Sequence, residues 1–116
     1  FMLSKTRVRD AAFVDCQAAY ARFDHCDLRG ARFERGDLRE ATFEGCDLSG
    51  AVFDGCDLQD AGFTGAKLAQ ADFRTSGVEG ARLALEQLRG AIVTAPQVLS
   101  LATQRHGLVV KSEDEP

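Results

Sequence analysis

The sequence predicts an all-β solenoid in which the chain turns a corner every five residues. A strict internal period decides the architecture before local propensities do. First, one phenylalanine recurs every ten residues without insertion: Phe13, Phe23, Phe33, Phe43, Phe53, Phe63 and Phe73. Second, another apolar series lies halfway between them: Ala18, Leu28, Leu38, Leu48, Leu58, Leu68 and Val78. Third, a small residue, most often alanine or cysteine, stands two positions before each large one.

A period of five matches neither the 3.6-residue repeat of a helix nor the alternation of an ordinary strand. Four five-residue words instead make one square coil of twenty residues, closed by the short turns that glycine and aspartate favour. The large residue and the small one before it then point inward, while the other three positions face outward or form the corner. Stacked at strand spacing, the words predict about four to five coils.

The register assigns each inward residue to one of four walls, which we name after early members. The Phe13 wall and the Phe23 wall are expected to face each other, and the Leu28 wall and the Leu38 wall close the square. The four series are Phe13, Phe33, Phe53 and Phe73; Phe23, Phe43, Phe63 and Leu83; Leu28, Leu48, Leu68 and Leu88; and Ala18, Leu38, Leu58 and Val78.

Several words resemble a known family closely. Cys-Asp-Leu-Arg-Gly at 26–30, Ala-Arg-Phe-Glu-Arg at 31–35 and Cys-Asp-Leu-Ser-Gly at 46–50 look like the words of pentapeptide repeat proteins. The resemblance covers roughly residues 1 to 90 and implies a right-handed quadrilateral β-helix. That family shares no catalytic residues, so the resemblance carries none over to this chain.

The pattern changes after residue 93, which divides the chain into three parts. Residues 1–93 are expected to form the β-helix, 94–110 a capping helix and a short strand, and 111–116 a disordered tail. Thr94 or Ala95 fits a helix cap, and Pro96 fits the first turn of a helix expected to end near His106. This helix is expected to be a lid over the last coil; a lid that also forms a dimer contact is the alternative.

Composition excludes several functions. The net charge of −4 and the pI near 5.1 argue against direct nucleic-acid binding, which needs a basic stripe. No apolar run approaches the roughly 18–20 residues of a membrane span. No signal peptide or cofactor motif is recognisable.

The four cysteines all fall on the inward small position, where alanine, glycine and serine also occur. We therefore expect buried free thiols that pack as small hydrophobic groups. Cys26 and Cys46 stack on adjacent coils, but parallel stacking points their Cβ atoms the same way and disfavours a disulfide. Inward thiols on different walls cannot converge on zinc, so no metal site is expected. Reduced thiols favour a cytoplasmic location.

No catalytic group is expected, and the chain is interpreted as a non-enzyme. His25 falls at an outward corner beside Asp24, and His106 falls at the end of the predicted helix. The serine and threonine residues have no partner that the register places beside them. A filled solenoid also lacks the cleft that an enzyme needs.

The outer surface is therefore the candidate functional feature. The Leu38 wall carries a candidate anionic partner-binding surface opposed only by Arg39: Asp37, Glu40, Asp57, Asp60 and Glu79. On the Leu28 wall, Asp27 stacks beside Asp47, an arrangement that is mildly destabilising. The alternative to a functional surface is that aspartate occupies these positions because it suits the turn.

Two functions follow, and we favour the first. The first is a rigid scaffold that binds a protein partner of unknown identity. The second is a DNA mimic, because the chain resembles the quinolone-resistance members of the family, which engage DNA gyrase through an acidic rod. Four coils span only about six base pairs, which weakens that match. A homodimer through the C-terminal helix or through the open N-terminal coil is a further alternative.

Overall fold

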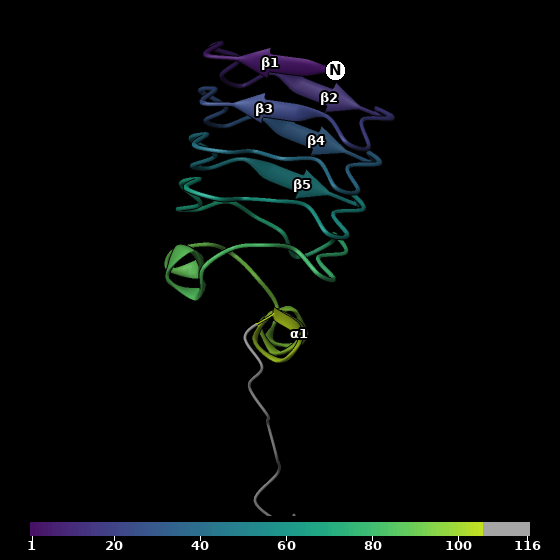
Figure 1. The fold of residues 1–116 in the computed structure, drawn as a ribbon, viewed down its shortest axis with the longest axis vertical. Helices are drawn as coiled ribbons and strands as arrows, with labels where there is room; N and C mark the ends of the chain where they lie inside the picture. Colours follow the sequence, from purple (N-terminus) through teal and green to yellow (C-terminus); the bar gives the residue numbers. More distant parts are fainter. Residues whose placement is uncertain (106–116) are drawn as a thin grey trace, which may run out of the picture.

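The computed structural model describes residues 1–105 and shows stacked square coils closed at one end by a helix (Figure 1). The regular strands are short because each wall of a coil holds only a few residues between two corners. The elements in chain order are β1 (Met2–Ser4), β2 (Ala12–Val14), β3 (Arg22–Asp24), β4 (Arg32–Glu34), β5 (Val52–Asp54), the 3₁₀ helix η1 (Leu85–Leu88) and α1 (Ala95–Arg105).

Parallel pairing between residues twenty apart builds the stack. β1 pairs with β3, and β2 pairs with β4, which pairs in turn with β5. Phe13 lies opposite Phe33, and Phe33 lies opposite Phe53. Single parallel bridges continue the same register elsewhere, as between Asp37 and Asp57. The predicted fold class, a quadrilateral β-helix with a C-terminal helix, is confirmed.

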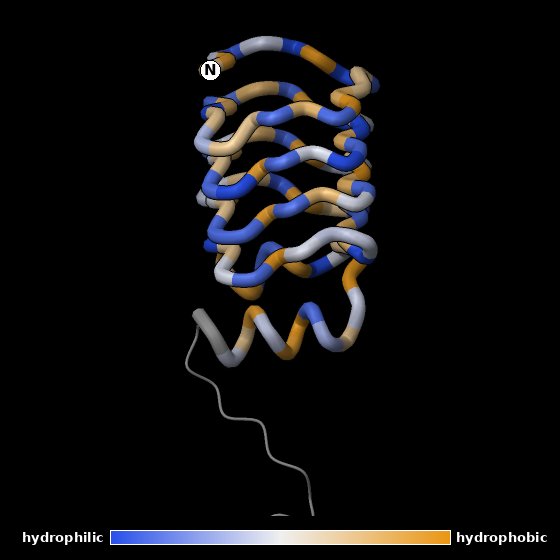
Figure 2. Tube along the Cα trace, turned by 90° about the vertical axis from the view of Figure 1, so that its right-hand side faces the viewer, coloured by the Kyte–Doolittle hydropathy of each residue, from blue (hydrophilic) through white to orange (hydrophobic). Residues whose placement is uncertain are grey.

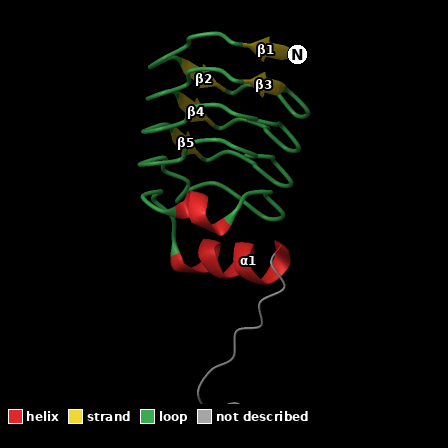
Figure 3. Cartoon of the chain, turned by 60° about the vertical axis from the view of Figure 1, so that its left-hand side comes forward, coloured by secondary structure: helices red, strands yellow, loops and turns green. Residues whose placement is uncertain are grey.

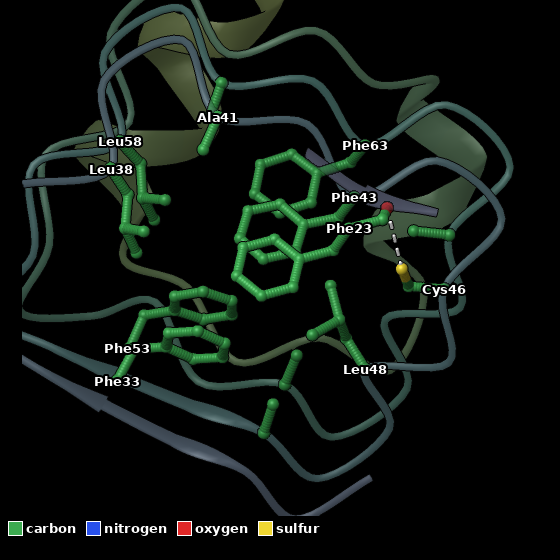
Figure 4. Packing of buried hydrophobic residues seen from close by; sticks show 14 of the residues in the cluster. Phe23, Phe33, Leu38, Ala41, Phe43, Cys46, Leu48, Phe53, Leu58 and Phe63 are labelled. Atoms are coloured by element: carbon green, nitrogen blue, oxygen red, sulfur yellow. Dashed lines mark hydrogen bonds between the residues drawn. The ribbon is translucent and has the colours of Figure 1, made fainter. Parts of the chain in front are cut away.

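The interior contains two facing columns of phenylalanine rings (Figure 4). Rings on the same wall stack with centroids 4.8–5.2 Å apart and planes within 2–8° of parallel. Rings from the two facing walls meet edge to face at 5.7–6.3 Å. Both arrangements suit the quadrupole of an aromatic ring. Hydrophobic segments therefore recur in every coil of the tube (Figure 2).

The residues expected in the core ladder all lie inside the tube, and all except Phe13 are buried. Phe13 is only half-buried, because it belongs to the first coil and has a neighbouring coil on one side alone. The buried members are Phe23, Phe33, Phe43, Phe53, Phe63, Phe73, Leu28, Leu38, Leu48, Leu58 and Leu68.

The cysteines are free thiols, and one of them shows what the inward small position does. The Cys46 thiol donates a hydrogen bond to the Phe23 carbonyl oxygen in the coil above (3.1 Å), and its sulfur accepts one from the Cys26 N–H (3.4 Å) (Figure 4). The Ser76 hydroxyl makes the same two kinds of hydrogen bond nearer the C-terminal end of the tube. It donates to the Phe53 carbonyl oxygen at 2.7 Å and accepts from the Cys56 N–H at 3.0 Å. Burial raises the pKa of Cys46 to about 12, so this thiol stays protonated and remains a donor.

The register breaks at η1, where the sequence places Glu86 at an inward small position. The chain opens outward there, and Glu86 is exposed. Leu88 is consequently half-buried, unlike the other leucines of its wall.

Below η1, α1 lies across the end of the tube (Figure 3). It begins at Ala95, one residue before the predicted start at Pro96. Leu101 and Ala102 are buried, and Leu101 belongs to the same hydrophobic cluster as the coils. The predicted lid position is thus observed, and no helix within residues 1–105 has the length and apolar character to cross a membrane. The predicted helix end at His106, the strand Leu108–Val110 and the tail 111–116 lie outside the described residues.

Candidate interaction surface

The outer faces of two opposite walls differ in charge. The outward and corner positions of the Leu38 wall carry five carboxylates and one guanidinium; the carboxylates, which we call the acidic wall, are Asp37, Glu40, Asp57, Asp60 and Glu79. Those of the Leu28 wall carry more cations than anions: Arg7, Arg9, Arg29, Lys67 and Arg89 against Asp10, Asp27 and Asp47. The acidic wall is therefore the strongest concentration of one charge on the tube.

Ladder bonds hold the acidic wall together. Asp37 is bridged to Asp57 in the next coil. The Asp60 N–H donates to the Glu79 carbonyl oxygen at 2.9 Å, and the Glu40 N–H donates to the Gln59 carbonyl oxygen at 2.9 Å. The structure thus brings all five predicted residues onto three consecutive coils of one wall.

Arg39 neutralises part of this charge. Its guanidinium forms a two-point contact with Asp37, with Nε 2.9 Å from Oδ1 and Nη2 2.8 Å from Oδ2. It also lies 4.0 Å from Asp57 Oδ2. The hydrogen bonds from Arg39 hold the pKa of Asp37 below its usual value and raise the pKa of Arg39. Exposed pairs of this kind contribute little stability, but they fix the side chains in place.

Turn preference explains two of the five carboxylates. Asp37 Oδ1 accepts the Arg39 N–H at 3.2 Å, and Asp57 Oδ1 accepts the Gln59 N–H at 3.1 Å. On the other walls, Asp27, Asp47 and Asp72 likewise accept a hydrogen bond from the backbone N–H two residues further along the chain. Aspartate therefore has a structural role at this position wherever it occurs. Glu40, Asp60 and Glu79 do not occupy this position.

An exposed aromatic residue borders the acidic wall. Tyr20 is 70% exposed, whereas the phenylalanines of the coils from residue 13 onward point inward. A hydrogen bond with Glu40 raises the pKa of Tyr20. Sequence reasoning missed Tyr20 because its position in the word is outward; an aromatic residue at a position otherwise polar is the signal that could have found it.

Two shallow hollows lie on this face, and Gln59 lines both. Gly77 continues the Asp37 and Asp57 column without a side chain, which leaves open space beneath Asp57. The first hollow has a volume of about 360 Å³ and is lined by Gly55, Cys56, Asp57, Gln59, Thr75, Gly77 and Glu79. The second has a volume of about 280 Å³ and is lined by Tyr20, Arg39, Glu40, Gln59 and Asp60.

On the opposite wall, an arginine offsets the predicted repulsion between Asp27 and Asp47. Arg29 Nη2 lies 2.7 Å from Asp27 Oδ2, and Arg29 Nε lies 3.8 Å from Asp47 Oδ2. Its hydrogen bonds lower the pKa of Asp27 to about 2. The predicted stacking of the two aspartates is observed, but the sequence did not show that one guanidinium spans both.

The histidine that lies within the described residues is on the surface. His25 Nδ1 is 2.7 Å from Asp24 Oδ1 at an exposed corner. Within residues 1–105, no group of three or more histidine, cysteine or acidic side chains is placed to hold a metal ion.

The comparisons with known proteins decide the family. The family described as pentapeptide repeat region matches residues 20–93, and pentapeptide repeats (8 copies) match residues 3–35. The chain belongs to the pentapeptide repeat family. The comparison with curated proteins gave no match.

Solved pentapeptide repeat structures share the fold of this pentapeptide repeat protein. The Rfr23 structure from the cyanobacterium Cyanothece 51142 matches at 22% identity and a TM-score of 0.50, covering 77% of this chain and 60% of that one. A structure from the Arabidopsis thaliana thylakoid lumen matches at 22% identity and a TM-score of 0.56, covering 85% and 76%. This chain thus spans about 60% of the length of Rfr23.

A plasmid-mediated fluoroquinolone resistance protein, QnrB1, also matches. Its identity is 16% and its TM-score 0.30, over 95% of this chain and 97% of that one. Superposition at that level carries no argument about function.

Proposed function

We propose that this pentapeptide repeat protein is a non-enzymatic scaffold whose acidic wall binds a partner protein through basic side chains. One observation carries the proposal: five carboxylates face outward on three consecutive coils, and Arg39 is the cation placed among them. Glu40, Asp60 and Glu79 stand at other positions of the five-residue word than Asp37 and Asp57, whose side chains accept the backbone N–H two residues further on.

The shape of this face supports a basic partner. The hollow beneath Asp57 is bordered by Glu79, and among the described residues no cation lies at ion-pair distance from Glu79. An arginine or lysine side chain entering there would meet two carboxylates. Tyr20 at the edge of the second hollow is an exposed aromatic residue of the type enriched at binding hot spots. Complementary charge of this kind speeds association and selects partners.

The test uses a synthetic peptide of alternating arginine and glycine as the probe, with binding measured by calorimetry at low and high salt. The variant Asp57→Lys with Asp60→Lys reverses the charge of the acidic wall. A long side chain is compatible with the left-handed backbone at residue 60 (φ 57°), because Tyr20 (φ 65°) and Glu40 (φ 57°) adopt it at the same corner of the preceding coils. We expect at least a tenfold loss of affinity and a weaker dependence on salt.

A matched control separates the wall from overall charge. Glu44→Lys with Asp54→Lys changes the net charge equally, at exposed positions on the Phe23 and Phe13 walls. This control should retain most of the affinity. Equal losses in both variants would show a diffuse charge effect and would refute the proposal.

DNA mimicry is the second candidate function, and the same acidic wall favours it. In that case the unmodified protein binds DNA gyrase with strong salt dependence, and the Asp57→Lys, Asp60→Lys variant loses that binding. A scaffold for another partner shows no gyrase binding at any salt concentration. The cytoplasmic location stays a prediction that rests on the reduced thiols.

A further inference from the structure

Two glutamines ten residues apart stand where the repeat breaks down. Gln87 lies in η1, and Gln97 lies in the first turn of α1. Each follows an apolar residue in the large inward series by four positions, Leu83 and Val93 respectively. Both side chains are half-buried beneath the last regular coils.

The two side chains make the same set of contacts. Gln97 Oε1 accepts the Thr94 N–H at 2.9 Å, and its Nε2 donates to the Phe73 and Ser76 carbonyl oxygens at 2.6 and 3.0 Å. Gln87 Oε1 accepts the Ala84 N–H at 2.7 Å. Its Nε2 donates to the Phe63 and Ala66 carbonyl oxygens at 2.7 and 2.9 Å.

These contacts take the place of a hydrogen bond that the next coil supplies at some of the phenylalanine carbonyls inside the tube. The Phe23 and Phe53 carbonyl oxygens each receive a hydrogen bond from an inward thiol or hydroxyl of the following coil. Phe63 and Phe73 stand at the end of the regular register, where no such residue follows. A primary amide has two N–H donors and one acceptor oxygen. It can therefore donate to two carbonyl oxygens of the last coils and accept the backbone N–H that precedes the helix.

We propose that Gln87 and Gln97 are clamps that end the β-helix, and that the Gln97 clamp holds α1 as a lid over its apolar end. The lid closes a small apolar cavity of about 10 Å³, whose lining includes Phe63, Phe73 and Leu88 of the coils and Leu101 of α1. The cap of the helix and its attachment to the coils depend on the same side chain. Losing Gln97 therefore weakens both at once, while the coils above keep their own ladder bonds.

The test is hydrogen exchange of the whole chain with Gln97→Ala. We expect the α1 amides to lose protection about tenfold to a hundredfold, since a helix cap and two carbonyl bonds are removed. Amides of the central coils, such as those of Leu48 and Phe53, should keep theirs. Gln59→Ala, at an exposed glutamine on the Leu38 wall, is the matched control and should change neither region.

Gln97→Glu tests the chemistry of the clamp. It keeps an oxygen for the Thr94 N–H but, once ionised, has no donor for the Phe73 and Ser76 carbonyls. We expect an open lid at pH 7 and partial recovery of protection at about pH 4, where protonation restores one donor. Unchanged α1 protection in Gln97→Ala, or equal losses in α1 and the central coils, would overturn the proposal. So would a Gln97→Glu lid that stays closed at pH 7.

Discussion

Replacing Phe43 with alanine should be among the most damaging single changes in the tube. Its ring is 0% exposed and touches four others. It stacks on Phe23 at 4.9 Å and on Phe63 at 5.2 Å, and it meets Phe33 and Phe53 edge to face at 5.8 Å each. Truncating a buried phenylalanine costs about 3–5 kcal/mol, and we expect a value near the upper end because four ring contacts disappear.

Phe13→Ala is the matched control, because it makes the same chemical change in the first coil. Phe13 is half-buried and contacts two rings, Phe33 at 4.8 Å and Phe23 at 6.2 Å. We expect its cost to be about half as large, roughly 2 kcal/mol. Urea unfolding followed by circular dichroism measures both. Equal costs, or a cost for Phe43→Ala below about 1.5 kcal/mol, would refute the view that stacked rings carry the stability of the tube.

Three further predictions concern the buried thiols and the loss of stability at low pH. Cys46→Ala should lower the free energy of unfolding by only about 1 kcal/mol, because the Cys26 N–H can then donate directly to the Phe23 carbonyl oxygen. A crystal structure of the variant would show this new bond. Cys46→Ser should keep the present hydrogen bonds of the corner. In the native protein, maleimide should label half-buried Cys16 well before Cys46, whose pKa is raised to about 12. Arg29 lowers the pKa of Asp27 from 3.8 to about 2, so the ion pair should stabilise the fold above about pH 4 and stop doing so as the pH falls towards 2. Urea unfolding of Asp27→Asn at a series of pH values should lack this loss of stability between about pH 4 and 2.

The walls of the tube could be predicted because the repeat has no insertions. Every inward residue has its neighbour twenty positions away, so counting alone assigns Phe13 and Phe33 to one wall and Phe23 and Phe43 to the other. The acidic wall follows from the same count. Hydrophobic periodicity and register are linear properties of a chain, which is why the sequence sufficed for them.

The corners could not be predicted in the same way. Phe23 and Phe43 begin similar corners, but the hydrogen bonds of these corners differ. At the first corner the Cys26 N–H donates to the Cys46 sulfur. At the second, the Cys46 N–H donates to the Phe43 carbonyl oxygen at 3.2 Å. The residue that follows in the same column is Cys46 in the first case and Ala66 in the second. The difference therefore depends on a side chain in the next coil, not on the corner's own residues.

The sequence by itself determined the coil, the four walls, the buried ladders and the presence of a helix after residue 93, because each depends on spacing along the chain. Only the tertiary structure decided how the tube ends, how Arg29 spans two aspartates, and that Tyr20 and two hollows border the acidic wall. The first hollow depends on Gly77, which has no side chain beneath Asp57. The end of the tube and the Arg29 contacts depend on where flexible polar side chains find partners in a neighbouring coil. Such partners are set by three-dimensional packing, and several arrangements fit one repeat pattern equally well.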